Sequence, residues 1–563
     1  MKLFAVSIVC IIFSFSCNAP AEWLMFGGDS ANSASSDTFV PRDLAAANIV
    51  SSGPIGIKDS SSPVVADGRV YVYCASSTNG AIRCLDSQSL ATIWSAPVPV
   101  ADYGWGSWAS PALGSSSIVY AADAFLGCWN LDGSLRWSVT MEHQTVNSSP
   151  LIIENRIYIG AFSYMNAEGG VGCYDSATGS QLWFNAVINN STFSSCSPVS
   201  LDDSITFGTG YACCSNQLWQ FSLETGTTFW QRTLPGRGLN NISFALPFTL
   251  LVVNYDFMYA ATNLYAYDTS GNFIWSAETG MSDMPPALYL DQSGFQIGIH
   301  SAGDSGVTPE LSAFNLATGA ELWRSSLAGN NANMPVISRD VVYAAQGRYA
   351  GWNFEGMTNL TAFDVRSGTP LAASGPVPGG FAPALSDDIL YTADNGILYA
   401  YQWPVSPLSL KKFNGRVLLA KIQADACKFF ATVPSAVIPT NWMNGMLEIS
   451  ISVGGIELFQ KTDDEYVVAE KGDKKLGFKY ISRDKSAKVK MIWKAKTGEV
   501  TIKALIKKHN LQSMLQQIPA QAGTTSQDLS ILLQAENHQF DAAATVSVPI
   551  TRKKDKLSIS YKQ

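Results

Sequence analysis

Short apolar segments alternate with polar turns along the first four hundred residues of the chain. A short apolar segment follows a proline, a turn containing Asp, Gly or Asn comes next, and a second apolar segment has tyrosine at its centre. This second segment appears as Val70–Val72, Val119–Ala121, Ile157–Ile159 and Val342–Ala344. Runs of β-branched and aromatic residues between turn residues predict β-strands. A third segment ends in a turn such as Asp175–Gly179, and a fourth carries a tryptophan.

This tryptophan recurs at a nearly constant spacing of 43 to 48 residues. A glycine stands four residues before it in every copy but the first, where Leu90 takes that place. The tryptophans are Trp94, Trp137, Trp183, Trp230, Trp275 and Trp323. A period in the forties with four strands per unit predicts the blades of a β-propeller. We expect each tryptophan to dock between neighbouring blades, as a structural residue, because its large apolar ring favours burial.

Eight such units can be counted. They begin at Pro63, Pro111, Pro150, Pro198, Pro247, Pro286, Pro335 and Pro383. The eighth stops at Trp403 without a fourth strand, while Trp23 stands ahead of the first unit. We therefore expect the N-terminal strand, with Trp23 as a further docking residue, to complete the last blade and close the ring. Blade seven departs from the pattern, with Ala372 in the tryptophan position.

Composition divides the chain into three parts. Residues 1–21 read as a signal peptide, with Lys2, an apolar run of 13 residues and a small-residue cleavage site at Ala21. Residues 22–404 form the predicted propeller, and residues 405–563 a predicted small β-sandwich domain. Residues 1–404 hold 13 Lys and Arg against 31 Asp and Glu, whereas residues 405–563 hold 24 against 14. We expect an exported protein, secreted, periplasmic or at the cell surface; a lipid anchor at Cys17 is the less favoured alternative.

Six of the ten cysteines fall into two groups. Cys84, Cys128 and Cys173 each stand two residues before the residue that begins the Asp…Gly turn, a place held by alanine in later units. We expect these three to be buried free thiols. Cys213 and Cys214 are adjacent, and we favour a disulfide from one of them to Cys196, with a Cys213–Cys214 bond as the alternative.

The repeat resembles that of pyrroloquinoline-quinone-type (PQQ-like) β-propellers, in which Ala-x-Asp-x-x-x-Gly-x-x-x-Trp docks each blade on the next. The segments 174–183, 266–275 and 313–323 carry this motif closely, and Trp23…Asp29 is similar to the start of compact family members. The resemblance implies the propeller fold over roughly residues 22–404. It admits quinone-dependent alcohol or sugar oxidoreductases and non-catalytic members such as the propeller subunit of the outer-membrane β-barrel assembly machinery.

An oxidoreductase of this family would need the quinone, Ca²⁺ and an aspartate base. No motif of the chain can be carried over to those roles, although Cys213-Cys214 resembles the adjacent cysteines of alcohol-oxidising quinoproteins. The four histidines are scattered without metal-ligand spacing. We therefore expect no catalytic residues, metal or cofactor, and a non-catalytic binding or scaffold protein. A third interpretation is an envelope assembly factor resembling the barrel-assembly subunit.

Aromatic residues gather in the predicted loops of one propeller face. They suggest a binding face for a protein or polysaccharide partner. The alternative is that these rings cover the ends of the core. The candidate residues are Trp105, Trp108, Tyr164, His300, Tyr349 and Trp352. We expect a monomer and no nucleic-acid partner.

The C-terminal part contains a strand with two distinct faces. Between residues 488 and 496, Val489, Met491, Trp493 and Ala495 take one face, and lysines take the other face at every position but 492, which is Ile. Such alternation predicts a half-buried antiparallel strand. We favour a solvated lysine face. The alternatives are binding of a polyanion, such as an acidic glycan, lipopolysaccharide or nucleic acid, and docking on the acidic propeller.

Overall fold

The computed structural model describes residues 22–562, except for short stretches. These are residues 39, 59–60, 76–78, 101–108, 146–147, 162–168, 187–196, 202–203, 210–216, 235–238, 246–248, 255–261, 280–281, 283, 291–294, 303–309, 328–330, 333, 351–352, 372–376, 380–381, 404–405, 408, 419–424, 435–446, 454–455, 464–466, 472–474, 482–486, 495–498, 510–522, 536–540 and 554–555. Beyond residue 403 the description is of the backbone. The chain divides into two compact units, Met1–Gln402 and Trp403–Gln563.

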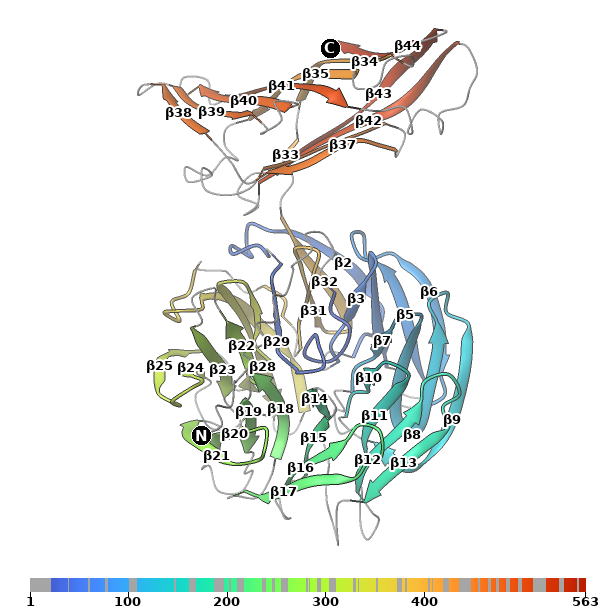
Figure 1. The fold of residues 1–563 in the computed structure, drawn as a ribbon, viewed down its shortest axis with the longest axis vertical. Helices are drawn as coiled ribbons and strands as arrows, with labels where there is room; N and C mark the ends of the chain where they lie inside the picture. Colours follow the sequence, from blue (N-terminus) through green and yellow to red (C-terminus); the bar gives the residue numbers. More distant parts are fainter. Residues whose placement is uncertain are drawn as a thin grey trace, which may run out of the picture. The chain divides into compact units, whose positions relative to one another are not determined.

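Eight small sheets make up the first unit and confirm the eight-bladed propeller (Figure 1). Blade 1 holds β3 (Val64–Ala66), β4 (Arg69–Cys74), β5 (Gly80–Asp86) and β6 (Thr92–Val98); blade 2 holds β7 (Ala112–Gly114), β8 (Ser117–Asn130) and β9 (Leu135–Thr145); blade 3 holds β10 (Leu151–Ile153), β11 (Arg156–Ala161), β12 (Gly170–Asp175) and β13 (Gln181–Ala186); blade 4 holds β14 (Val199–Leu201), β15 (Ser204–Thr209), β16 (Gln217–Ser222) and β17 (Thr228–Thr233).

The second half of the ring repeats this plan. Blade 5 holds β18 (Leu239–Ala245), β19 (Thr249–Asn254), β20 (Thr262–Asp268) and β21 (Phe273–Thr279); blade 6 holds β22 (Ala287–Leu290), β23 (Gln296–Ala302), β24 (Glu310–Asn315) and β25 (Glu321–Ser326); blade 7 holds β1 (Ser35–Ser36), β26 (Asn331–Ala332), β27 (Val336–Ser338), β28 (Val341–Ala350) and β29 (Asn353–Asp364); blade 8 holds β30 (Ala384–Ser386), β31 (Ile389–Asp394), β32 (Ile397–Gln402) and β2 (Asn48–Pro54).

The N-terminal part of the chain closes the ring, as predicted. β2 pairs antiparallel with β32 and supplies the fourth strand that the eighth repeat lacks. Trp23 is not in this strand, which corrects the expected role of that residue. It forms an antiparallel bridge with Val65 in the first strand of blade 1. In the closing strand, Val50 stands opposite Ala400, where blades 1, 2, 3, 5 and 6 place a tryptophan opposite Cys or Ala and blade 4 places Trp230 opposite Gln220.

The predicted start of the fifth unit at Pro247 is wrong. The first strand of blade 5 is β18, which ends at Ala245 and pairs with β19. The proline therefore follows the first strand of this blade, whereas in the other blades the first strand follows the proline.

The blades bury their middle strands almost completely. In β4 and β11, five of the six residues are buried, as expected for strands covered on both faces by neighbouring blades. Cys84, Cys128 and Cys173 are buried free thiols, which confirms the prediction for these residues. Burial raises the pKa of Cys84 and of Cys173 to about 11, so both thiols stay protonated near neutral pH.

The second unit is built from one large sheet. Its strands are β33 (Ser406–Pro407), β34 (Ser409–Leu418), β35 (Asp425–Pro434), β36 (Leu447–Val453), β37 (Ile456–Asp463), β38 (Val467–Lys471), β39 (Lys475–Ile481), β40 (Ala487–Lys494), β41 (Glu499–His509), β42 (Gly523–Ala535), β43 (Asp541–Lys553) and β44 (Lys556–Lys562). The order is β37-β36-β42-β43-β44-β34-β35-β41-β40-β39-β38, and β33 pairs with β43. A two-layered sandwich stays a prediction. In the part of the chain that the structure describes, no helix is long and apolar enough to cross a membrane.

Candidate functional site

The repeated tryptophans lie at the seams between blades. Each packs on the glycine in the turn of the next blade: a Cβ added at Gly179 would lie 2.6 Å from the Trp137 ring. The same relation joins Trp94 to Gly133, Trp183 to Gly226, Trp230 to Gly271, Trp275 to Gly319 and Trp323 to Gly368. These glycines all have positive φ, a conformation that costs other residues steric strain. The motif is therefore structural at these six seams.

Most seams share one hydrogen bond. The indole Nε1 of Trp137 donates to the carbonyl oxygen of Ser176, 3.0 Å away, in the turn of the following blade. Equivalent bonds join Trp94 to Leu131, Trp230 to Thr269, Trp275 to Leu316 and Trp323 to Val365. At each of these seams the hydrogen bond orients the indole ring, and the ring packs between the two neighbouring blades.

The seam between blades 3 and 4 is the exception. The carbonyl oxygen of Leu223, equivalent to that of Ser176, accepts hydrogen bonds from the Tyr158 hydroxyl (3.0 Å) and from Arg156 (3.3 Å). A carbonyl oxygen has two lone pairs. The buried Nε1 of Trp183 accordingly has no partner among the described residues.

The predicted aromatic face falls largely outside the described residues. Trp105, Trp108, Tyr164 and Trp352 lie there, as do Cys196, Cys213 and Cys214. Tyr349 belongs to β28, of which only the backbone is described at this point. His300 does not open a loop, because β23 continues to Ala302, and its side chain is 1% exposed. His300 is thus a core residue and not part of an exposed face.

The middle of the ring is occupied by the chain's own N-terminal segment (Figure 1). Residues 23–36, here called the axial segment, present their backbone carbonyls to the first, innermost strands of the blades. The oxygen of Leu24 accepts from Leu113 N of blade 2 (2.7 Å), and those of Ser30, Ala31, Ser33 and Ala34 accept from Ser200, Phe244, Leu288 and Ile337 of blades 4 to 7 (2.8 Å each). An innermost strand is a sheet edge with unpaired N–H groups, and the axial segment pairs one from each of these blades and a second, that of Arg339, from blade 7.

Local hydrogen bonds and two glycines bend the axial segment. The Asp29 carboxylate accepts hydrogen bonds from the backbone N–H of Ala31 (2.9 Å) and of Ser33 (3.0 Å). Gly27 and Gly28 have positive φ, and a Cβ on Gly28 would lie 2.9 Å from the Trp23 ring. The Trp23…Asp29 motif thus encodes a tight bend against the first blade.

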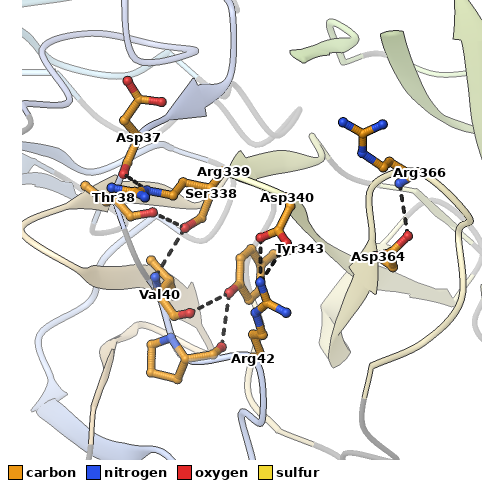
Figure 2. Close-up of polar contacts among 11 residues, drawn as sticks. Asp37, Thr38, Val40, Arg42, Ser338, Arg339, Asp340, Tyr343, Asp364 and Arg366 are labelled. Carbon is orange, nitrogen blue, oxygen red and sulfur yellow. Dashed lines mark hydrogen bonds and ion pairs between the residues drawn. The ribbon is translucent and has the colours of Figure 1, made fainter. Parts of the chain in front are cut away.

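Blade 7 clasps the residues that follow the axial segment (Figure 2). The Ser338 hydroxyl oxygen accepts a hydrogen bond from the backbone N–H of Val40 (3.2 Å). The buried Tyr343 hydroxyl donates to the Val40 carbonyl oxygen (3.0 Å). Burial raises the pKa of Tyr343, which therefore remains a donor. Nη2 of Arg42 forms an ion pair with both carboxylate oxygens of Asp340, at 2.6 and 2.7 Å. These contacts direct the chain from the middle of the ring to the outer edge of blade 8.

The outer strands carry a repeated exposed apolar residue that the sequence interpretation missed. It stands immediately before the docking tryptophan and is 41–52% exposed in five blades. The five, here called the rim residues, are Ile93, Leu182, Phe229, Ile274 and Leu322; blade 2 has Arg136 instead. The apolar-Trp pairs are visible in the sequence and were the signal for them. Isolated exposed apolar residues are ordinary, but one register repeated in five blades is a pattern.

The donor set for a quinone-bound cation is also tested by the structure. Across the described residues, no three His, Cys, Asp or Glu side chains lie close enough to share a metal ion. We derive no step through that group.

Comparison with known families agrees with the geometry of the seams. The profile of the outer membrane protein assembly factor BamB matches residues 46–243 and 260–403. The chain belongs to this family. The match includes the closing strand β2. Its gap, residues 244–259, falls in blade 5 and contains β19. Comparison with curated proteins gives no match.

Solved structures share the fold at low sequence identity. A europium-containing methanol dehydrogenase has a TM-score of 0.51 and 14% identity over 66% of this chain and 89% of its own. BamB from Moraxella catarrhalis has a TM-score of 0.44 and 16% identity over 63% of this chain and 100% of its own. Quinohemoprotein alcohol dehydrogenase from Comamonas testosteroni has a TM-score of 0.48 and 13% identity, over 68% and 77%. At these identities the likeness shows the fold alone.

Proposed function

We propose that the protein is an exported, non-catalytic scaffold of the cell envelope whose blade rims bind extended segments of a protein partner. The observation that carries this proposal is the set of rim residues, repeated at one position of the outer strand in five blades. Family membership supports an assembly role, because the family profile bears the name of an outer membrane assembly factor. The apolar run and cleavage site in residues 1–21 support export.

The rim suits strand addition for a physical reason. An outermost strand has one row of backbone N–H and C=O groups without a neighbour in its own sheet. A partner strand can pair with that row while its apolar side chains cover the rim residue. Phe229 is 52% exposed, so covering it would contribute about 1 kcal/mol, or roughly a fivefold gain in affinity.

The experiment uses the mature chain and a panel of synthetic extended peptides with alternating apolar and polar residues. The double variant Leu182→Glu/Phe229→Glu should weaken binding by at least about tenfold, since two apolar contacts are lost. The control is Gln181→Glu/Gln231→Glu, which adds the same charge at exposed positions of the same strands, β13 and β17. Equal binding by both variants would disprove the rim site.

Partner identity can then be pursued at the same positions. A photo-reactive residue at 229 should form cross-links to an envelope protein in intact cells, and the same residue at 231 should form fewer. Cross-links that are equal at both positions would indicate chance encounters.

A second candidate is a PQQ-dependent alcohol or sugar oxidoreductase, favoured by the structural likeness to the methanol dehydrogenase. It is tested by adding the quinone and Ca²⁺ to the mature protein and measuring dye reduction with alcohols and sugars. Reduction above the protein-free control would displace the scaffold proposal.

A further inference from the structure

Lysines of neighbouring strands stand in register in the C-terminal sheet. Lys490 of β40 lies opposite Lys479 of β39 on one side and Lys503 of β41 on the other. Lys503 lies opposite Phe430 of β35, and Phe430 opposite Lys412 of β34. Lys412 in turn lies opposite Lys562 of β44. The resulting lysine row is Lys479, Lys490, Lys503, Phe430, Lys412 and Lys562.

The row belongs to a single face of the sheet. Residues directly opposite one another in antiparallel strands share a face. With strands about 4.8 Å apart, six strands make a row roughly 24 Å long. The adjacent register position holds Phe478, Met491, Ile502 and Ala431 on the other face. The face that carries these residues is apolar. The lysine row lies on the opposite face, which suits contact with water or with a partner.

Other charges on this face reinforce the row. Lys488 and Lys494 lie two and four residues from Lys490 on the same strand, and Lys475 is opposite Lys494. Glu499, also opposite Lys494, is the one acidic residue on this face of the described strands β39, β40 and β41. The face is thus strongly positive along a line.

The pairing of lysines across strands β39, β40 and β41 favours a binding face over a merely solvated face. Like charges directly opposite one another destabilise a sheet, and a merely solvated face would be better served by lysines opposite acidic residues. Three consecutive lysines, Lys479, Lys490 and Lys503, instead carry this repulsion across three strands. A bound anion would remove it.

We propose that the lysine row binds an acidic polysaccharide. This inference concerns the second unit and does not rest on the function proposed for the propeller rim. A uronic-acid chain carries one carboxylate per ring along a line, so successive rings can meet successive lysines. The aromatic residue at position 430 interrupts the charge with the residue type on which sugar rings pack. Double-stranded nucleic acid is less suitable, because it carries a charge about every 1.7 Å along its axis.

The experiment measures binding of labelled polygalacturonate to the mature full-length chain at low salt. The wild type should bind, and its affinity should fall at least about tenfold between 50 and 200 mM salt as counterions compete. The triple variant Lys479→Gln/Lys490→Gln/Lys503→Gln should lose at least tenfold in affinity. The control Lys461→Gln/Lys553→Gln/Lys556→Gln removes the same charge outside the row and should lose less than threefold.

Thermal unfolding separates loss of binding from loss of folding. At low salt without polymer, the row variant should unfold at the same temperature as the wild type or higher, because cross-strand repulsion is gone. Equal losses in row and control variants, an absence of binding, or a row variant that unfolds earlier would overturn the proposal. Binding of polyphosphate or anionic vesicles without binding of polygalacturonate would overturn it as well.

Discussion

The tryptophan seams allow a sharp comparison between two blades. Trp137 and Trp183 are both half-buried, and each packs on a positive-φ glycine of the following blade. They differ at one atom, since Nε1 of Trp137 donates to Ser176 O at 3.0 Å while Nε1 of Trp183 has no partner among the described residues. Replacing each with phenylalanine removes similar apolar area and isolates the hydrogen bond.

The two substitutions should have different costs. Trp137→Phe loses a hydrogen bond worth about 1 kcal/mol and leaves the Ser176 carbonyl without its indole donor. Trp183→Phe removes a buried donor whose desolvation costs about 1–3 kcal/mol and is repaid by no bond. We therefore expect Trp137→Phe to be more destabilising than Trp183→Phe by about 2 kcal/mol, after the loss of ring area common to both.

Urea titration of the mature protein, followed by intrinsic fluorescence and circular dichroism, measures the difference. Trp183→Ala serves as the reference for loss of the whole ring and should destabilise by about 3–5 kcal/mol without changing peptide binding at distant blades. The variants Tyr158→Phe and Tyr158→Phe/Trp183→Phe test whether freeing Leu223 restores the bond to Trp183, since loss of the indole should then cost more than it does in the wild type. Equal costs for Trp137→Phe and Trp183→Phe would refute the reasoning.

Other predictions follow from single positions. Leu90→Gly should destabilise by about 2–4 kcal/mol in urea titration despite relieving a positive φ, because Leu90 is 1% exposed and its removal leaves a cavity. Asp340→Asn should cost at most about 1 kcal/mol, less at high salt, because both ends of its ion pair are about half exposed. Burial, and then Asp388, raises the pKa of Asp387, so ionisation of Asp387 opposes folding above its ordinary pKa. Asp387→Asn should therefore raise the free energy of unfolding relative to wild type at pH 7 and bring no gain at pH 3. Cys173 should resist alkylation in the native protein at pH 8 and react in urea, as mass spectrometry would show, because its pKa is about 11.

Much of the propeller could be predicted because its main signal is local. A glycine and a tryptophan four residues apart define one turn and one strand, and the Trp–Gly contact recurs at six seams. The exceptions are explained by topology. Blade 8 places Val50 in the tryptophan position, which leaves room for Leu90 in the next turn. Blade 8 also has no turn between a third and a fourth consecutive strand, so a tryptophan at position 372 would have no glycine to meet.

The lysine row shows the limit of reading one strand at a time. The alternation of Lys488 to Lys494 predicts two faces, and the structure has a strand there. Whether lysines meet across strands depends on pairing between segments far apart in the chain, such as Lys412 with Lys562. A shift of one residue in that register would move the partner to the other face, and no local pattern fixes it.

The axial segment could not be predicted for a related reason. Its carbonyls accept from N–H groups of six innermost strands, those of blades 1, 2 and 4 to 7, and those groups come together only when the ring has formed. From Gly27 onward its residues are small or polar, which suggests a loop, while Asp29 and the glycines specify only the bend. The chain that follows the axial segment then supplies β2 to the last blade. The N-terminal residues thus contribute both to the middle of the ring and to its closing strand in blade 8. The ring cannot close before blade 8 has formed, and we expect the two ends of the repeat array to unfold together.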